Sequence, residues 1–142
     1  MIMKTILATV ATAGVLLCQT KSGAVHVNAA EARWEHEARD PVGAESVTLR
    51  EDEKTGGMEL LVHYPGGHVF KPHWHDSNER IVMLEGRLSL RNGDSERFLD
   101  AGGYAFLPAR ELQTLVCVSQ TRCAYYVAWD GSVKSHPAPA PK

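Results

Sequence analysis

Two histidines and a glutamate in the middle of the chain have the types and the spacing of a metal-binding set. His73 and His75 are two residues apart, and successive side chains of a strand point to opposite faces, so both imidazoles are expected on one face. Glu79 follows the short polar turn of residues 76–78 and opens an apolar run, residues 81–84, with strong β preference. If this run folds back beside the first strand, the Glu79 carboxylate meets the two imidazoles. Such a set suits a divalent first-row transition metal and leaves coordination positions open for water, substrate or dioxygen.

The spacing around these residues resembles the first motif of the cupin family. Gly67 is followed by five residues, His-x-His, three residues, the glutamate, six residues and Gly86, and every defining position of the motif is matched. The resemblance implies an all-β fold, a double-stranded β-helix or jelly-roll barrel, with His73, His75 and Glu79 as metal ligands.

The second cupin motif, which supplies a fourth ligand in that family, is matched only in part. Gly102 and Pro108 stand at its positions, but Arg110 replaces a glycine and Gln113 replaces the ligand histidine. A glutamine amide oxygen can ligate a metal, although it is neutral and weaker than imidazole, so Gln113 is a candidate fourth ligand. The alternative is a barrel that has lost its metal and keeps a polar cavity; the three retained ligands favour metal binding. Iron, manganese, zinc, nickel and copper all tolerate this set, so the sequence does not select the metal.

The strand pattern agrees with an all-β sandwich or barrel. About nine or ten short segments of β preference are separated by turn residues, and Asn92-Gly93 is a strong hairpin signal. By strand alternation, Trp74 and Arg80 should point away from the candidate ligands. The segments are residues 46–50, 58–64, the strand with the two histidines, 79–84, 87–91, 98–99, 104–107, 112–118 and 124–129.

The chain of 142 residues has room for one domain. The barrel is expected at residues 46–130, preceded by an arm at residues 31–45, which could be a short helix or a dimerisation element. The proline- and alanine-rich residues 131–142 are expected to form a flexible tail. A net charge of −2 argues against a nucleic-acid-binding surface.

Residues 1–30 have the pattern of a signal peptide. Lys4 precedes an apolar run at residues 6–17, and small residues follow, with cleavage after Ala24 or Ala29. The run is too short to span a membrane comfortably, and no other segment approaches the ~18 apolar residues required. Export to the periplasm or the medium is therefore expected.

Three cysteines bear on this expectation. Cys18 raises the alternative of a lipid-modified cysteine, but Leu17 directly before it fits poorly, because that position normally holds a small residue. Cys117 and Cys123 flank residues 119–121, and in an oxidising compartment they could face each other across a hairpin. The sequence does not decide whether these two cysteines form a disulfide or remain two buried thiols.

Two functions of different class follow. Nucleophilic hydrolysis is disfavoured, because no Gly-x-Ser-x-Gly turn is present and neither later cysteine has a visible catalytic partner. Cupins include dioxygenases, isomerases, decarboxylases and lyases, but also non-catalytic sensors and storage proteins, so the fold does not select among them. The first hypothesis is an exported metal-dependent oxygenase or isomerase acting on a small molecule. The second is a metal- or small-ligand-binding sensor or scavenger without turnover.

Overall fold

The computed structural model describes residues 23–36 and 41–138. The apolar run of the expected signal peptide and Cys18 lie outside these ranges, so the signal peptide and its cleavage site stay predictions. Within the described ranges, no helix has the length and apolar character needed to cross a membrane.

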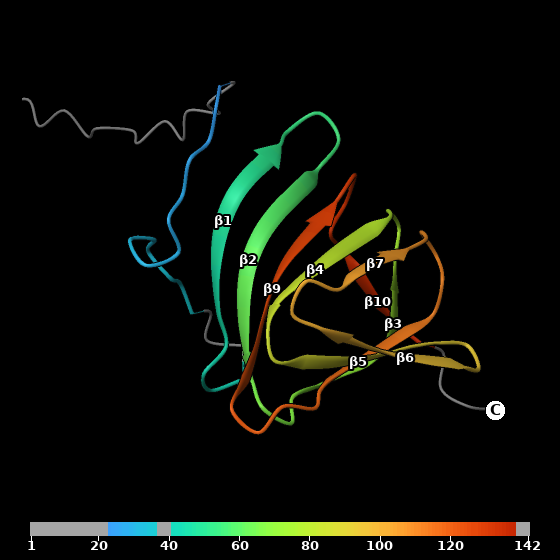
Figure 1. Cartoon of the computed structure of the whole chain (residues 1–142). Coiled ribbons are helices and arrows are strands. Elements are labelled where there is room, and N and C mark those ends of the chain that lie inside the picture. Colours follow the sequence, from blue (N-terminus) through green and yellow to red (C-terminus); the bar gives the residue numbers. More distant parts are fainter. Residues whose placement is uncertain (1–22, 37–40, 139–142) are drawn as a thin grey trace, which may run out of the picture.

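The described part of the chain is all-β, which confirms the predicted fold class. Its strands form two five-stranded antiparallel sheets, in the orders β1-β2-β9-β4-β7 and β10-β3-β8-β5-β6 (Figure 1). The strands are β1 (Glu45–Asp52), β2 (Gly57–Pro65), β3 (Val69–His75), β4 (Glu79–Glu85), β5 (Arg87–Asn92), β6 (Ser95–Asp100), β7 (Tyr104–Leu107), β8 (Gln113–Cys117), β9 (Arg122–Trp129) and β10 (Ser135–Pro137).

Local sequence explains much of this pattern. In β5, Leu88 and Leu90 are buried, as the alternation of polar and apolar residues predicts, but Ser89 between them is also buried and donates a hydrogen bond to Glu96. Asn92 pairs with Ser95, so that Gly93, with a φ of 54°, lies in the predicted tight turn between β5 and β6. The inner faces of both sheets form one core, whose largest fully buried side chains are Ile81, Met83, Leu88, Val127, Cys117 and Cys123.

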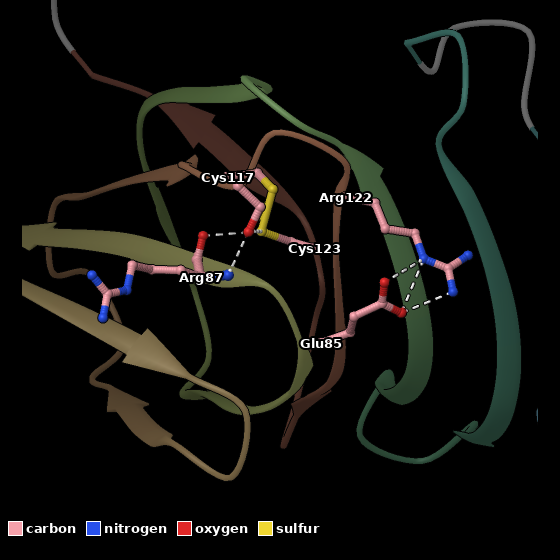
Figure 2. Close-up of a disulfide and its surroundings, with 6 residues drawn as sticks. Glu85, Arg87, Cys117, Arg122 and Cys123 are labelled. Carbon is pink, nitrogen blue, oxygen red and sulfur yellow. Dashed lines mark hydrogen bonds and ion pairs between the residues drawn. A yellow bond between two sulfur atoms is a disulfide. The ribbon is translucent and has the colours of Figure 1, made fainter.

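Cys117 and Cys123 form a disulfide between the end of β8 and the start of β9, with a Cα–Cα distance of 5.7 Å. Beside it, Arg122 donates hydrogen bonds from Nε and Nη2 to the Glu85 carboxylate at 2.8 to 3.1 Å (Figure 2). Because Gln113 begins β8 and Cys117 ends it, the disulfide closes the end of the barrel opposite to the candidate ligands.

Both flanking segments contact the barrel. Glu35 pairs with Ser46, and the Trp34 ring stacks on His63 with ring centroids 3.8 Å apart, so residues 31–36 of the arm run beside β1, and the described residues of the arm form no helix (Figure 1). Within the expected tail, Ser135–Pro137 form β10 on the open edge of β3, and residues 139–142 lie outside the described ranges. Composition suggested mobility, but the unpaired backbone groups of β3 are satisfied by this short strand.

Candidate metal centre

His73, His75 and Glu79 line a single cavity of about 390 Å³ between the two sheets. The two histidines end β3, and Glu79 begins β4 directly after the turn that joins these strands. Gln113 is the cross-strand partner of His73 on β8, which brings the four predicted site residues to one end of the barrel.

Backbone carbonyl groups fix the tautomer of both histidines. The Nδ1 atom of His73 lies 2.7 Å from the carbonyl oxygen of Lys71, and that of His75 lies 3.1 Å from the carbonyl oxygen of Val133. A carbonyl only accepts, so each neutral ring carries its hydrogen on Nδ1 and has the lone pair on Nε2. Burial, followed by the charge of His73, lowers the pKa of His75, which favours this neutral form. This arrangement leaves Nε2 free to ligate a metal, while the other ring N–H is held by the backbone.

The third candidate ligand, Glu79, is buried and contacts Gln113. Its Oε2 atom lies 3.6 Å from His75 Nε2, and only 5 % of the residue is exposed. Burial raises the pKa of Glu79 to about 7, while the hydrogen bond from Gln113 acts in the opposite direction. The Gln113 amide nitrogen donates to Glu79 Oε2 at 2.5 Å and lies 3.3 Å from His73 Nε2.

In the present arrangement of the site, the side-chain amide of Gln113 contacts two of the candidate ligands, His73 and Glu79. Across the described ranges, no three histidine, cysteine, aspartate or glutamate side chains are placed to hold a metal ion directly. The Gln113 amide group instead contacts two of the atoms that would face the ion, Glu79 Oε2 and His73 Nε2. The donor set nevertheless fits a divalent transition metal: two imidazole lone pairs and a desolvated carboxylate converge, and a rotation of the Gln113 amide would present its oxygen.

The turn before Glu79 is held by contacts that sequence reasoning missed. The Asn78 side chain donates to Asp130 Oδ2 at 2.9 Å and accepts from the backbone N–H of Ala109 at 3.0 Å. The backbone N–H of Arg110 donates to the carbonyl of His75 at 2.8 Å. These bonds join the turn to the loop after β7 and to the end of β9, and the position of Asn78 directly before Glu79 was the only local signal.

Two side chains near the ligands point away from the cavity, as alternation predicted. Trp74 stacks on His136 with ring centroids 4.0 Å apart, and Arg80 lies 3.4 Å from Asp130. Neither residue lines the cavity.

The remainder of the cavity wall is mainly apolar and aromatic. A small, largely preformed apolar pocket with a few convergent polar groups is typical of small-ligand sites. The apolar and aromatic lining residues are Leu60, Val62, Tyr64, Phe70, Pro72, Leu115, Tyr125, Val127, Trp129 and Pro137.

Comparisons with known proteins agree with this architecture. KdgF from a Halomonas species superimposes with a TM-score of 0.63 at 18% identity, over 79% of this chain and 97% of that protein. The DMSP lyase DddQ from Ruegeria pomeroyi gives 0.62 at 18% identity, over 80% of this chain and 64% of that protein. The cupin domain of Cnp3 from Schizosaccharomyces pombe gives 0.60 at 13% identity, over 75% and 74% of the two chains. At these identities the likeness shows the fold alone.

A search of curated protein sequences gave no match. The family model of the ChrR cupin-like domain, in contrast, matches residues 22–132, most of the chain. This chain therefore belongs to the ChrR cupin-like family of the cupin superfamily.

Proposed function

We propose that this protein is an exported cupin that binds a divalent transition metal through His73, His75 and Glu79 and acts on a small molecule as an oxygenase or isomerase. The observation that carries the proposal is the pair of imidazoles whose Nε2 lone pairs are set by backbone carbonyls, beside a buried carboxylate in an apolar cavity. Two of the fold neighbours are a lyase and KdgF, so action on a small molecule is within the range of this fold.

The residues of the chain have separate parts in this proposal. His73, His75 and Glu79 would hold the ion, and Gln113 would add an amide oxygen after rotation of its side chain. A metal in this position supplies Lewis acidity or, when it is redox active, the activation of dioxygen. The apolar wall excludes water and orients a compact substrate against the ligand end of the cavity.

A second candidate function is a metal- or ligand-binding module without turnover. One observation favours it: the Gln113 amide already satisfies Glu79 and His73, so the protein is internally paired without an ion. A Gln113→His variant separates the two candidates. New or altered turnover would support an enzyme, whereas a change in metal affinity alone would support a binder.

The first experiment is elemental analysis of the mature protein purified without chelators. Near-stoichiometric metal is expected in the wild type and none in a double variant with His73→Ala and His75→Ala. His63→Gln is the matched control, because His63 lies outside the cavity and stacks on Trp34. Absence of metal from the wild type, even after reconstitution with iron, manganese, zinc, nickel and copper salts, would overturn the metal proposal.

A further inference from the structure

One wall of the cavity is shaped by an irregularity in β3. Phe70 pairs with Leu115 and His73 pairs with Gln113, so three steps along β3 lie opposite two steps along β8. This bulge allows Phe70 and His73, which are three residues apart, to line the same cavity. It also brings Lys71 to the cavity rim, beside the candidate ligands.

Lys71 differs from every other side chain around the cavity. Among the described residues that line it, Lys71 alone is a permanent cation, and Glu79 is the only carboxylate. Lys71 is solvent-exposed, and its ammonium group forms no ion pair with a carboxylate of the described residues. Glu79 lies deep in the cavity, and its Oε2 already accepts a hydrogen bond from Gln113.

The charge is therefore asymmetric along the cavity. Lys71 lines the cavity and is solvent-exposed, and the aliphatic and aromatic wall extends from it between the two sheets. An ammonium group at the mouth of a low-dielectric pocket attracts an anion, and pairs with it more strongly than in water. A cationic ligand would gain nothing from Lys71, and a neutral ligand would gain less than an anion, since it forms no ion pair.

We propose that the cavity takes a compact organic monoanion, in which a carboxylate pairs with Lys71 at the rim and an aliphatic or aromatic body lies against the apolar wall. This inference rests on the proposed function only in that the cavity binds a small molecule. It names the substrate class and assigns Lys71 as the residue that selects it.

The test measures binding of benzoate, phenylacetate and hexanoate by nuclear magnetic resonance titration, each beside its neutral primary amide. The wild type, Lys71→Met and Lys54→Met are compared as purified, with the metal content of each measured. Lys54 is the matched control, because it is exposed in the turn between β1 and β2 and does not line the cavity. The methionine side chain keeps most of the length of lysine and removes the charge.

At least one carboxylate is expected to bind the wild type and Lys54→Met about fivefold to tenfold more tightly than its amide. In Lys71→Met this preference should disappear, while binding of the amide is unchanged, which also shows that the variant is folded. Equal affinity of carboxylate and amide for the wild type, or a preference that persists in Lys71→Met, would overturn the proposal, as would failure of all three carboxylates to bind. The metal analysis is independent of this binding test. If the protein holds metal but shows no preference for carboxylates, only the proposal about Lys71 and the anionic ligand is overturned.

Discussion

The side-chain amide of Gln113 donates to the buried carboxylate of Glu79 at an N–O distance of 2.5 Å, and the two residues are 2 % and 5 % exposed. In this orientation the amide turns its nitrogen toward the candidate ligands. For the amide oxygen to ligate a metal, Gln113 must rotate and give up its contacts with both Glu79 and His73. Metal binding and the internal pairing of this amide therefore compete.

Replacing Gln113 with histidine should remove this competition. The variant is expected to bind zinc or nickel at least about tenfold more tightly than the wild type, because a neutral imidazole is a better ligand than an amide oxygen and the amide nitrogen that contacts Glu79 is removed. Competition titration with a chromophoric chelator measures the affinity. Thr114→His is the control for an added histidine, since Thr114 does not line the cavity. Equal affinity in the wild type and Gln113→His would show that position 113 does not face the ion.

The raised pKa of Glu79 predicts how the stability of the metal-free protein depends on pH. The native pKa of about 7 exceeds the unfolded value near 4.5, so the native state holds the extra proton between these values. The free energy of unfolding should then fall as pH rises through this window, by the order of 3 kcal/mol for a shift of this size. His75 acts in the opposite direction, because its lowered pKa removes stability as pH falls below about 6.5.

Glu79→Gln isolates the contribution of the carboxyl group. The amide introduced by this substitution keeps an oxygen that accepts from Gln113 but does not titrate, and His75 is common to both proteins. Urea unfolding with a chelator at pH 5 and pH 8 should show the wild type losing stability relative to Glu79→Gln as the pH is raised. A stability difference that stays constant with pH would mean that Glu79 is ionised throughout.

The sequence was sufficient to predict which side chains share one face of a strand and where most strands lie, because both depend on local alternation. Trp74 and Arg80 point away for the same local reason. His73, His75 and Glu79 line one cavity because the short turn after β3 carries the chain into β4 of the facing sheet, so the expectation that this run folds back beside the histidine strand was wrong.

Other features depend on contacts that no local pattern encodes. The Val133 carbonyl that orients His75 is 58 residues away in sequence, and its segment is held by the pairing of β10 with β3 and by the hydrogen bond from Ser77 to the Ser132 carbonyl. The rim position of Lys71 depends on a bulge whose existence follows from the register of β8 against β3. The orientation of the Gln113 amide follows from which neighbours donate and which accept, so the residue type alone could not predict it.

The same distant strand gives a prediction for His136. Its ring stacks on Trp74, and its Nε2 lies 2.7 Å from Asp76 Oδ2, so one side chain holds β10 against β3. His136→Ala should speed amide hydrogen exchange at Ala138, whose N–H donates to the carbonyl of Pro72. It should also weaken metal binding about tenfold, because His75 loses the carbonyls that orient it.

His136→Phe is the control, because it keeps the stacked ring, and its amide exchange and metal affinity should lie closer to those of the wild type. Unchanged exchange in His136→Ala would show that β10 is held by other contacts.

Arg110 stands where the family motif has glycine, and its φ of 65° is the only positive value at a non-glycine residue in the described ranges. This left-handed conformation costs an L-residue with a Cβ atom roughly 1 to 2 kcal/mol, whereas glycine adopts it freely. Arg110→Gly should therefore raise the free energy of unfolding by about 1 kcal/mol, after the greater freedom of glycine in the unfolded chain is counted. Urea unfolding measures the change, and Arg110→Ala is the control, because it removes the guanidinium group but keeps the Cβ atom. If alanine stabilises as much as glycine, the arginine side chain, and not the backbone conformation, is the source of the cost.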